Sequence, residues 1–313
     1  MTQFAKGSIA MVLACLAWGL SPVYYALFQA ISPAEILAHR TLWSVVTFVT
    51  LLVLTGRTGQ TFQVVKQPRV MGLILLAGVM IAINWYVFIF SVSVGRVTES
   101  SLGYYIFPLV MVLLGLVAFR ETLSVLQWVA IVLAGVAVLV LTIGLGAAPW
   151  LALMISLSFG IYGLLKRIIK VDSIVSVTLE VLLLLPIALG YLYAFADLPD
   201  TKTLLALMFS GLITAGPLVL MTYATQRVPM ATVGLLQYLN PILQYFCAIV
   251  ILGEVITGWH IIAIALIWIA LACVAVLVLT IGLGAAPWLA LMISFSFGIY
   301  GLLKRIIKGD SVV

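Results

Sequence analysis

Ten stretches of about twenty mostly apolar residues dominate this chain of 313 residues. A helix needs roughly 20 such residues to cross the hydrocarbon core of a bilayer, because each residue advances it by about 1.5 Å. We therefore predict an all-α integral membrane protein with ten transmembrane helices. The predicted spans are 7–29, 32–55, 70–94, 100–119, 127–143, 148–165, 173–195, 203–225, 231–252 and 258–280.

The composition favours a lipid environment and excludes several kinds of site. Hydrophobic residues make up 65% of the chain and charged residues 8%, against roughly 45–50% and 25% in average soluble domains. The net charge of +6 comes from basic residues in ones and threes between the spans. This pattern is typical of cytoplasmic loops, so we expect no nucleic-acid partner. Cys15, Cys247 and Cys273 all lie in apolar spans without metal-ligand spacing, so we expect no metal and no cofactor.

A weak internal repeat relates residues 99–121 to residues 232–254 at a spacing of 133. In each copy an apolar helix carries a proline, which removes a backbone donor and predicts a helix break. Two such interrupted segments, at corresponding places in two halves, are typical of secondary transporters with a substrate site between the repeats. The first span carries Trp18, Gly19 and Pro22, which predict a bend. The repeated pairs are Leu102 and Leu235, Tyr105 and Tyr238, Pro108 and Pro241, and Glu121 and Glu254.

Basic residues in short loops predict the orientation, because such loops favour the cytoplasm. The opposite loops hold Arg96 and Lys202 beside Glu99, Asp197 and Asp200. The amino terminus is therefore expected in the cytoplasm. Five spans per half is an odd number, so the second half enters the membrane from the other side and forms an inverted repeat. The residues assigned to the cytoplasmic side are Lys6, Arg57, Lys66, Arg69, Arg120, Lys166, Arg167, Lys170 and Arg227.

Several segments resemble the RarD-type branch of the EamA family, within the drug/metabolite transporter superfamily. They are PAEILAHRTLWS (33–44), Asn84-Trp85, ESSLGYYIFPL (99–109), LSFGIYGLLKR (157–167), the stretch 180–186 and LLQYLNP (235–241).

The resemblance covers about residues 1–280 and implies ten helices, both termini in the cytoplasm and a central cavity for small metabolites or drugs. It also implies the bacterial inner membrane. One position departs from the family pattern: Phe107 stands where an asparagine is expected, whereas Asn240 keeps the corresponding place in the ninth span.

Arg40 lies about a turn and a half into the second span, and a charge near a helix centre costs on the order of 3 kcal/mol. Glu35 and His39 are four residues apart and share a face, with Arg40 adjoining it. We interpret the three as an anchor for an anionic or zwitterionic group near the outer mouth of the cavity, with His39 or Glu35 as a proton sensor. The alternative is structural: Glu35 caps the helix after Ser32, and Arg40 snorkels or pairs with Glu35.

Glu180, about two turns into the seventh span, is the near-symmetric counterpart of Arg40. Our hypothesis is that it takes a coupling proton or faces a substrate amine, and the alternative is a buried structural hydrogen bond. Uncharged polar and aromatic side chains complete the expected cavity wall, with helix packing as the alternative role for each. They are Asn84, Trp85, Tyr104, Tyr105, Gln237, Tyr238 and Asn240.

We predict a secondary transporter that moves a small metabolite or amphipathic drug by alternating access, with the bilayer and the solute as partners and a homodimer left open. A structural or assembly role is the first alternative. An enzyme is the second, and we predict none: His39 and His260 lie in opposite halves, and no paired carboxylates or glycine-rich phosphate loop are present.

Residues 274–313 nearly duplicate residues 136–175, with differences at only three positions. We therefore divide the chain into a first repeat (1–146), a second repeat (147–283) and an accessory or artefactual tail (284–313) that duplicates 146–175. An eleventh crossing would carry Lys304, Arg305 and Lys308 outside, against the positive-inside preference. We expect the tail to lie at the cytoplasmic interface or loosely beside the bundle.

Overall fold

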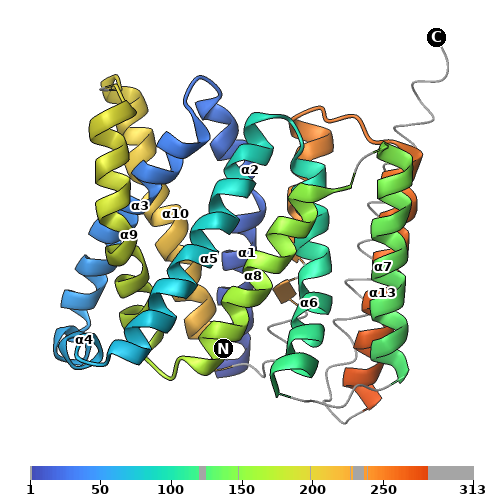
Figure 1. Cartoon of the computed structure of the whole chain (residues 1–313), viewed down its shortest axis with the longest axis horizontal. Coiled ribbons are helices and arrows are strands. Elements are labelled where there is room, and N and C mark those ends of the chain that lie inside the picture. Colours follow the sequence, from blue (N-terminus) through green and yellow to red (C-terminus); the bar gives the residue numbers. More distant parts are fainter. Residues whose placement is uncertain are drawn as a thin grey trace.

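A computed structural model describes residues 2–119, 125–146, 148–197, 199–225, 227, 236–237 and 239–280 (Figure 1). Long helices run side by side across the molecule, and no strand occurs in these ranges. Glu121, Tyr238 and the tail 284–313 lie outside the described residues, so the expectations for them stay predictions.

The first half contains α1 (Gln3–Gly19), α2 (Ser21–Tyr25), η1 (Ala26–Phe28), α3 (Pro33–Leu54), α4 (Thr58–Val65), α5 (Pro68–Ser93), α6 (Val97–Phe119) and α7 (Val125–Leu145). The second contains α8 (Trp150–Ile168), α9 (Ser173–Phe195), α10 (Thr201–Thr225), α12 (Leu239–Phe246), the π-helix η2 (Cys247–Ile251) and α13 (Gly258–Thr280).

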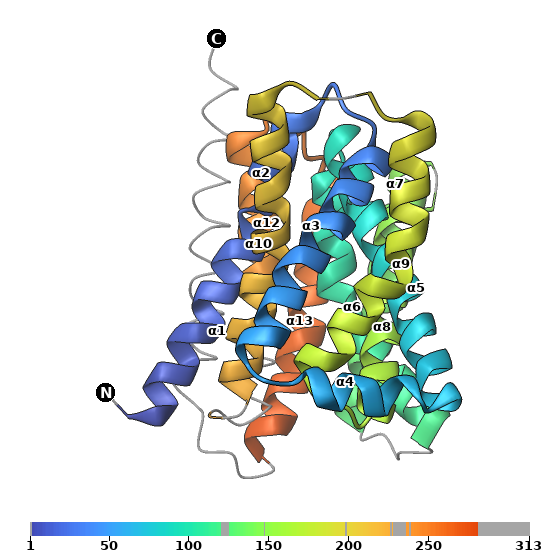
Figure 2. The same cartoon turned by 90° about the vertical axis from the view of Figure 1, so that its left-hand side faces the viewer.

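Among the described residues, five helices are long and apolar enough to cross a membrane by length and composition alone, and further apolar helices are shorter. The short α4 and the amino terminus mark one end of the bundle (Figure 2). We call this the α4 end and the other the far end.

Local sequence determines where the first helices begin and end. The first span bends where α1 ends at Gly19 and α2 begins at Ser21, with Pro22 in its first turn, as predicted. Ser32 caps α3 by accepting the Glu35 N–H at 3.2 Å, which confirms the predicted helix start.

The predicted helix breaks at the repeated prolines have different outcomes. The backbone of α6 stays helical through position 108, so the break predicted there is wrong. Pro241 lies in the first turn of α12, and this helix begins directly after a position outside the described residues. The ninth span departs from regular α-helix at η2, where the chain forms a π-helix that no proline signal predicted.

The packing of the helices follows the predicted two-fold relation between the halves. Equivalent helices meet directly in the pairs α3–α9 and α7–α13, and Figure 1 shows the second pair at one edge. Other contacts come in exchanged pairs: α1–α10 matches α5–α8, α1–α12 matches α6–α8, and α3–α10 matches α5–α9. Such exchange is expected of an inverted repeat.

Glycines at equivalent positions permit the closest of these crossings. A Cβ on Gly19 of α1 would lie 2.5 Å from the Leu243 Cβ of α12, and a Cβ on Gly160 of α8 would lie 2.7 Å from the Val110 Cγ1 of α6. Leu243 and Val110 are themselves 133 residues apart. Small residues let apolar helices approach closely, so both halves use the same device at the same place.

Candidate functional site

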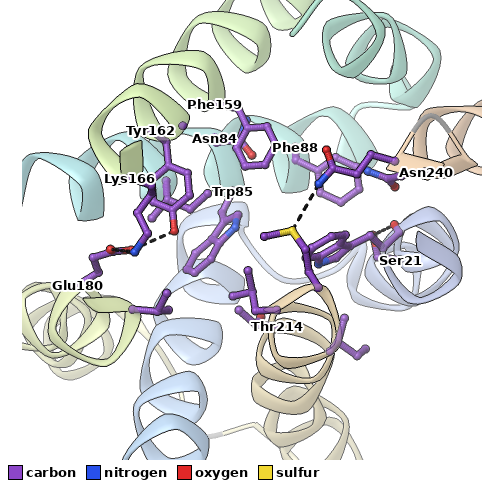
Figure 3. Close-up of a pocket in the computed structure, with 18 of the residues that line it drawn as sticks. Ser21, Asn84, Trp85, Phe88, Phe159, Tyr162, Lys166, Glu180, Thr214 and Asn240 are labelled. Carbon is purple, nitrogen blue, oxygen red and sulfur yellow. Dashed lines mark hydrogen bonds and ion pairs between the residues drawn. The ribbon is translucent and has the colours of Figure 1, made fainter. Parts of the chain in front are cut away.

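A cavity of about 610 Å³ lies between the two halves. Its wall is built by α1, α2, α3, α5 and α6 from the first half and by α8, α9, α10 and α12 from the second. Most of the lining side chains are apolar or aromatic, with a few polar groups among them (Figure 3). This volume and character are typical of a small-molecule site.

Most of the candidate residues line this cavity. The helices bring together Arg40, Asn84, Trp85, Tyr104, Glu180, Gln237 and Asn240, with the helix-break residue Pro241.

Three candidates lie elsewhere. Glu35 is half-buried in the first turn of α3, and His39 is buried with no hydrogen-bond partner for its Nδ1 among the described residues. Neither lines the cavity, so the expected cluster with Arg40 at its mouth does not form there. Tyr105, 2% exposed, packs instead in an apolar core with residues of α7, α12 and α13. Tyr238 and the side chain of Pro108 are outside what the structure describes.

Arg40 is 5% exposed and is held on two sides. Its Nε donates to the Thr214 Oγ1 at 2.9 Å, and its Cζ lies 4.2 Å from the centre of the Trp85 ring. The ion pairs among the described residues are Arg57–Asp172, Arg96–Glu99 and Lys166–Glu180. The alternative pairing of Arg40 with Glu35 is therefore wrong, and Arg40 has no carboxylate partner in this part of the chain.

Glu180 is 1% exposed and accepts hydrogen bonds from three side chains. The Lys166 Nζ lies 2.7 Å from its Oε1, the Ser176 Oγ lies 2.9 Å from the same oxygen, and the Tyr162 hydroxyl lies 3.2 Å from its Oε2. Figure 3 shows Lys166 and Tyr162 reaching Glu180 from one helix, α8. The carboxylate is thus neutralised by a cation and held by two hydroxyl groups.

Sequence reasoning placed Lys166 in a cytoplasmic loop and missed it as a cavity residue. The helix α8 extends to Ile168, beyond the predicted end of the sixth span, and so carries Lys166 on the cavity face. A signal was present: Phe159, Tyr162 and Lys166 follow at spacings of three and four, which place them on one helix face.

Asn84 fastens three helices together. Its Nδ2 donates to the Ile155 carbonyl at 3.1 Å and to the Ser158 Oγ at 3.4 Å, and its Oδ1 accepts from the Tyr104 hydroxyl at 3.0 Å. Both amide protons are therefore used between α5 and α8. The orientation of the Asn84 side chain is therefore determined by these contacts between helices and does not require a ligand.

Other polar groups around the cavity have hydrogen-bonding atoms that are not used within the described residues. The Gln244 Nε2 donates to the Asn240 Oδ1 at 3.1 Å, while its Oε1 is buried with no hydrogen-bond partner among the described residues. The Tyr25 hydroxyl is also buried and unpartnered within the described part of the chain. Phe107 lines the cavity and packs on Phe159 with ring centres 4.7 Å apart, so this position adds apolar wall where an asparagine was expected.

A bundle of apolar helices arranged as an inverted repeat around a mostly apolar cavity defines a multi-pass membrane protein of the transporter kind. Comparisons with known proteins agree. The model of the EamA-like transporter family matches residues 5–143 and again residues 147–276. An "Uncharacterized transporter" of Vibrio cholerae is 37% identical over 87% of this chain and 92% of its own. The "Protein RarD" of Salmonella typhimurium is 35% identical over 86% of this chain and 94% of its own.

The chain belongs to the EamA-like transporter family. A solved crystal structure shares the fold, with a TM-score of 0.61 and 16% identity over 89% of this chain and 99% of the other. The predicted family, the all-α membrane fold and its ten helices are therefore confirmed.

Proposed function

We propose that this protein is a secondary transporter that moves a small amphipathic solute by alternating access through the central cavity. The observation that carries the proposal is the position of the cavity, which both halves line with equivalent helices. Relative rocking of two inverted repeats exposes such a site to each side in turn. We assign substrate contact to the lining candidates Arg40, Trp85, Tyr104, Gln237 and Asn240, and a positioning role to Glu180.

We further propose the bacterial inner membrane as the location, with the amino terminus in the cytoplasm. The order of the helices supports this orientation, because the connections that carry Arg57, Lys66, Arg69 and Lys170 all fall at the α4 end. Basic residues in short loops favour the cytoplasmic side. The division into repeats 1–146 and 147–283 belongs to the same proposal, and a homodimer is to be judged from the mass of the purified protein in detergent.

The test is uptake of a panel of labelled solutes into proteoliposomes, with and without a pH gradient. Solute accumulation that depends on the protein is expected. Arg40→Ala and Glu180→Gln should reduce it while the protein still inserts, and Arg40→Lys should restore it in part, because a point charge lacks the planar fork of a guanidinium. Wild-type uptake by both neutral variants, at normal membrane levels, would remove these two charges from the mechanism.

A further inference from the structure

We propose that the substrate is an organic anion, a carboxylate on an apolar and preferably aromatic body, and that Arg40 is its anchor. This inference rests on the proposed transport through the central cavity. It concerns the charge and shape of the solute, which nothing about the family membership specifies.

The cavity wall carries one positive charge that no acidic residue in the described part of the lining balances. The ionisable side chains that line it, among the described residues, are Arg40, Lys166, Glu180 and the tyrosines. Lys166 and Glu180 neutralise each other at 2.7 Å. One positive charge is left over, on Arg40. A buried charge without a counter-ion is costly in an apolar site, and an anionic solute supplies the missing partner.

The contacts of Arg40 hold its guanidinium group in one orientation. The Thr214 hydroxyl donates its own proton to the Ser210 carbonyl at 2.9 Å, so its oxygen is left to accept the Arg40 Nε–H. The Trp85 ring packs on the guanidinium at 4.2 Å. These two contacts fix the plane of the group and use only one of its three nitrogens. The remaining two form the fork that matches a planar carboxylate.

Tyr25 supplies a second hydrogen-bond donor close to Arg40. The Tyr25 side chain is 3% exposed, lines the cavity, and has its ring centre 5.6 Å from the Arg40 Cζ. Its hydroxyl has no hydrogen-bond partner within the described residues. Buried hydroxyl groups normally find a partner. An oxyanion held on Arg40 offers the acceptor that Tyr25 lacks.

The rest of the cavity wall favours an apolar body for the solute over an amine or a sugar-like one. An amine would find the carboxylate of Glu180 already occupied by Lys166, Ser176 and Tyr162. A heavily hydroxylated solute would lose many hydrogen bonds with water, and the mostly apolar wall offers few groups to replace them. An apolar body fits instead, and aromatic rings stack well on one another. The aromatic side chains of the wall are Trp18, Tyr25, Phe48, Trp85, Phe88, Tyr104, Phe107, Phe159 and Tyr162.

The test is isothermal titration calorimetry of the purified full-length protein with three probes that share one aromatic body. The probes are naphthylacetate, naphthylacetamide and naphthylethylamine. The wild type is expected to bind the carboxylate at least about tenfold more tightly than the amide, because hydrogen bonds to ionised groups are the stronger ones. The amine is expected to bind more weakly still.

Variants separate the anchor from general damage. Arg40→Gln should bind the acid and the amide equally, and Arg40→Lys should keep part of the preference. Thr214→Val should weaken acid binding and leave amide binding as it was, because only the positioning of the guanidinium changes. Arg69→Gln is the matched control, since Arg69 is exposed and lies outside the cavity. Each variant must elute from size exclusion as the wild type does, and Arg40→Lys keeps the inference testable if Arg40→Gln does not.

Three results would overturn the inference: equal binding of acid and amide by the wild type, an unchanged acid preference in Arg40→Gln, or no binding of naphthylacetate at millimolar concentration. Uptake of the same probes into proteoliposomes separates the two proposals. Binding of the acid without uptake would refute transport and keep the anion site. Uptake of the amine in place of the acid would keep transport and refute the anion site.

Discussion

The ion pair between Lys166 and Glu180 should have a much larger coupling energy than a second ion pair of the same length in this protein. The Lys166 Nζ and the Glu180 Oε1 are 2.7 Å apart, with the side chains 23% and 1% exposed. The Arg57 Nη1 and the Asp172 Oδ1 are 2.8 Å apart, with both side chains 31% exposed. Since the distances match, the difference in burial should be the main cause of a difference between the two coupling energies.

Removing one partner of a buried pair costs roughly 3–5 kcal/mol, because the other charge stays buried without compensation. Lys166 is partly exposed, so we expect the lower end, about 3 kcal/mol for Glu180→Gln. The double variant Lys166→Met with Glu180→Gln leaves no lone charge. It should therefore be more stable than the sum of the single variants predicts, by about 2 kcal/mol.

The assay is a double-mutant cycle measured by equilibrium unfolding in mixed micelles. The control cycle uses Arg57→Gln and Asp172→Asn, because asparagine keeps the capping of α9 that Asp172 provides. Its coupling should be about 0.2–1 kcal/mol, the range of exposed pairs. Equal coupling energies in the two cycles would refute the argument from burial.

Three further predictions concern the orientation, the close helix crossing and the tail. Reporters inserted near Gln60 and near Asp200 should label from the cytoplasm and from the outside respectively, and reversed labelling would contradict the assigned orientation. Gly160→Leu should lower the midpoint of thermal unfolding by overpacking α8 on α6, at a cost of about 1–3 kcal/mol, whereas Gly190→Leu, with nothing within 4 Å of its Cβ position, should not; equal midpoints would count against the close approach. A stop after Leu283 should preserve uptake, and its loss at normal protein levels would make the tail part of the transporter.

The sequence predicted the helices well because each apolar span had to supply its own backbone hydrogen bonds. Apart from the ninth span, whose start lies outside the described residues, the spans drawn from hydropathy match the observed helices to within a few residues, and the bend at Gly19 to Pro22 is where it was expected. The break expected at position 108 was wrong, since helix α6 continues through it. A proline signals a missing donor, but neighbouring helices decide whether the helix bends.

The candidate site was harder to predict, because successive residues on a helix point about 100° apart. Arg40 and Tyr104 line the cavity, while their direct neighbours His39 and Tyr105 do not. The sequence alone shows which polar and aromatic residues lie near one another on a helix, but not which of them face the cavity. Lys166 was missed for a related reason: a basic residue at a helix end looks like a loop cation until a carboxylate from another helix is placed beside it.

The two halves of this protein share their helix packing but differ in several of the residues that line the cavity. The glycine crossings recur in both halves, and so do the exchanged helix contacts. At three pairs of equivalent positions that face the cavity, the residues differ in charge or polarity, so the two halves offer a solute different groups. If the cavity binds a solute as proposed, a symmetric scaffold with an asymmetric lining should hold it in one preferred orientation, because turning the solute by the two-fold axis exchanges a cation for a carboxylate. The equivalent lining pairs are Tyr104 with Gln237, Phe107 with Asn240, and Arg40 with Glu180, the last two being the eighth residues of α3 and α9.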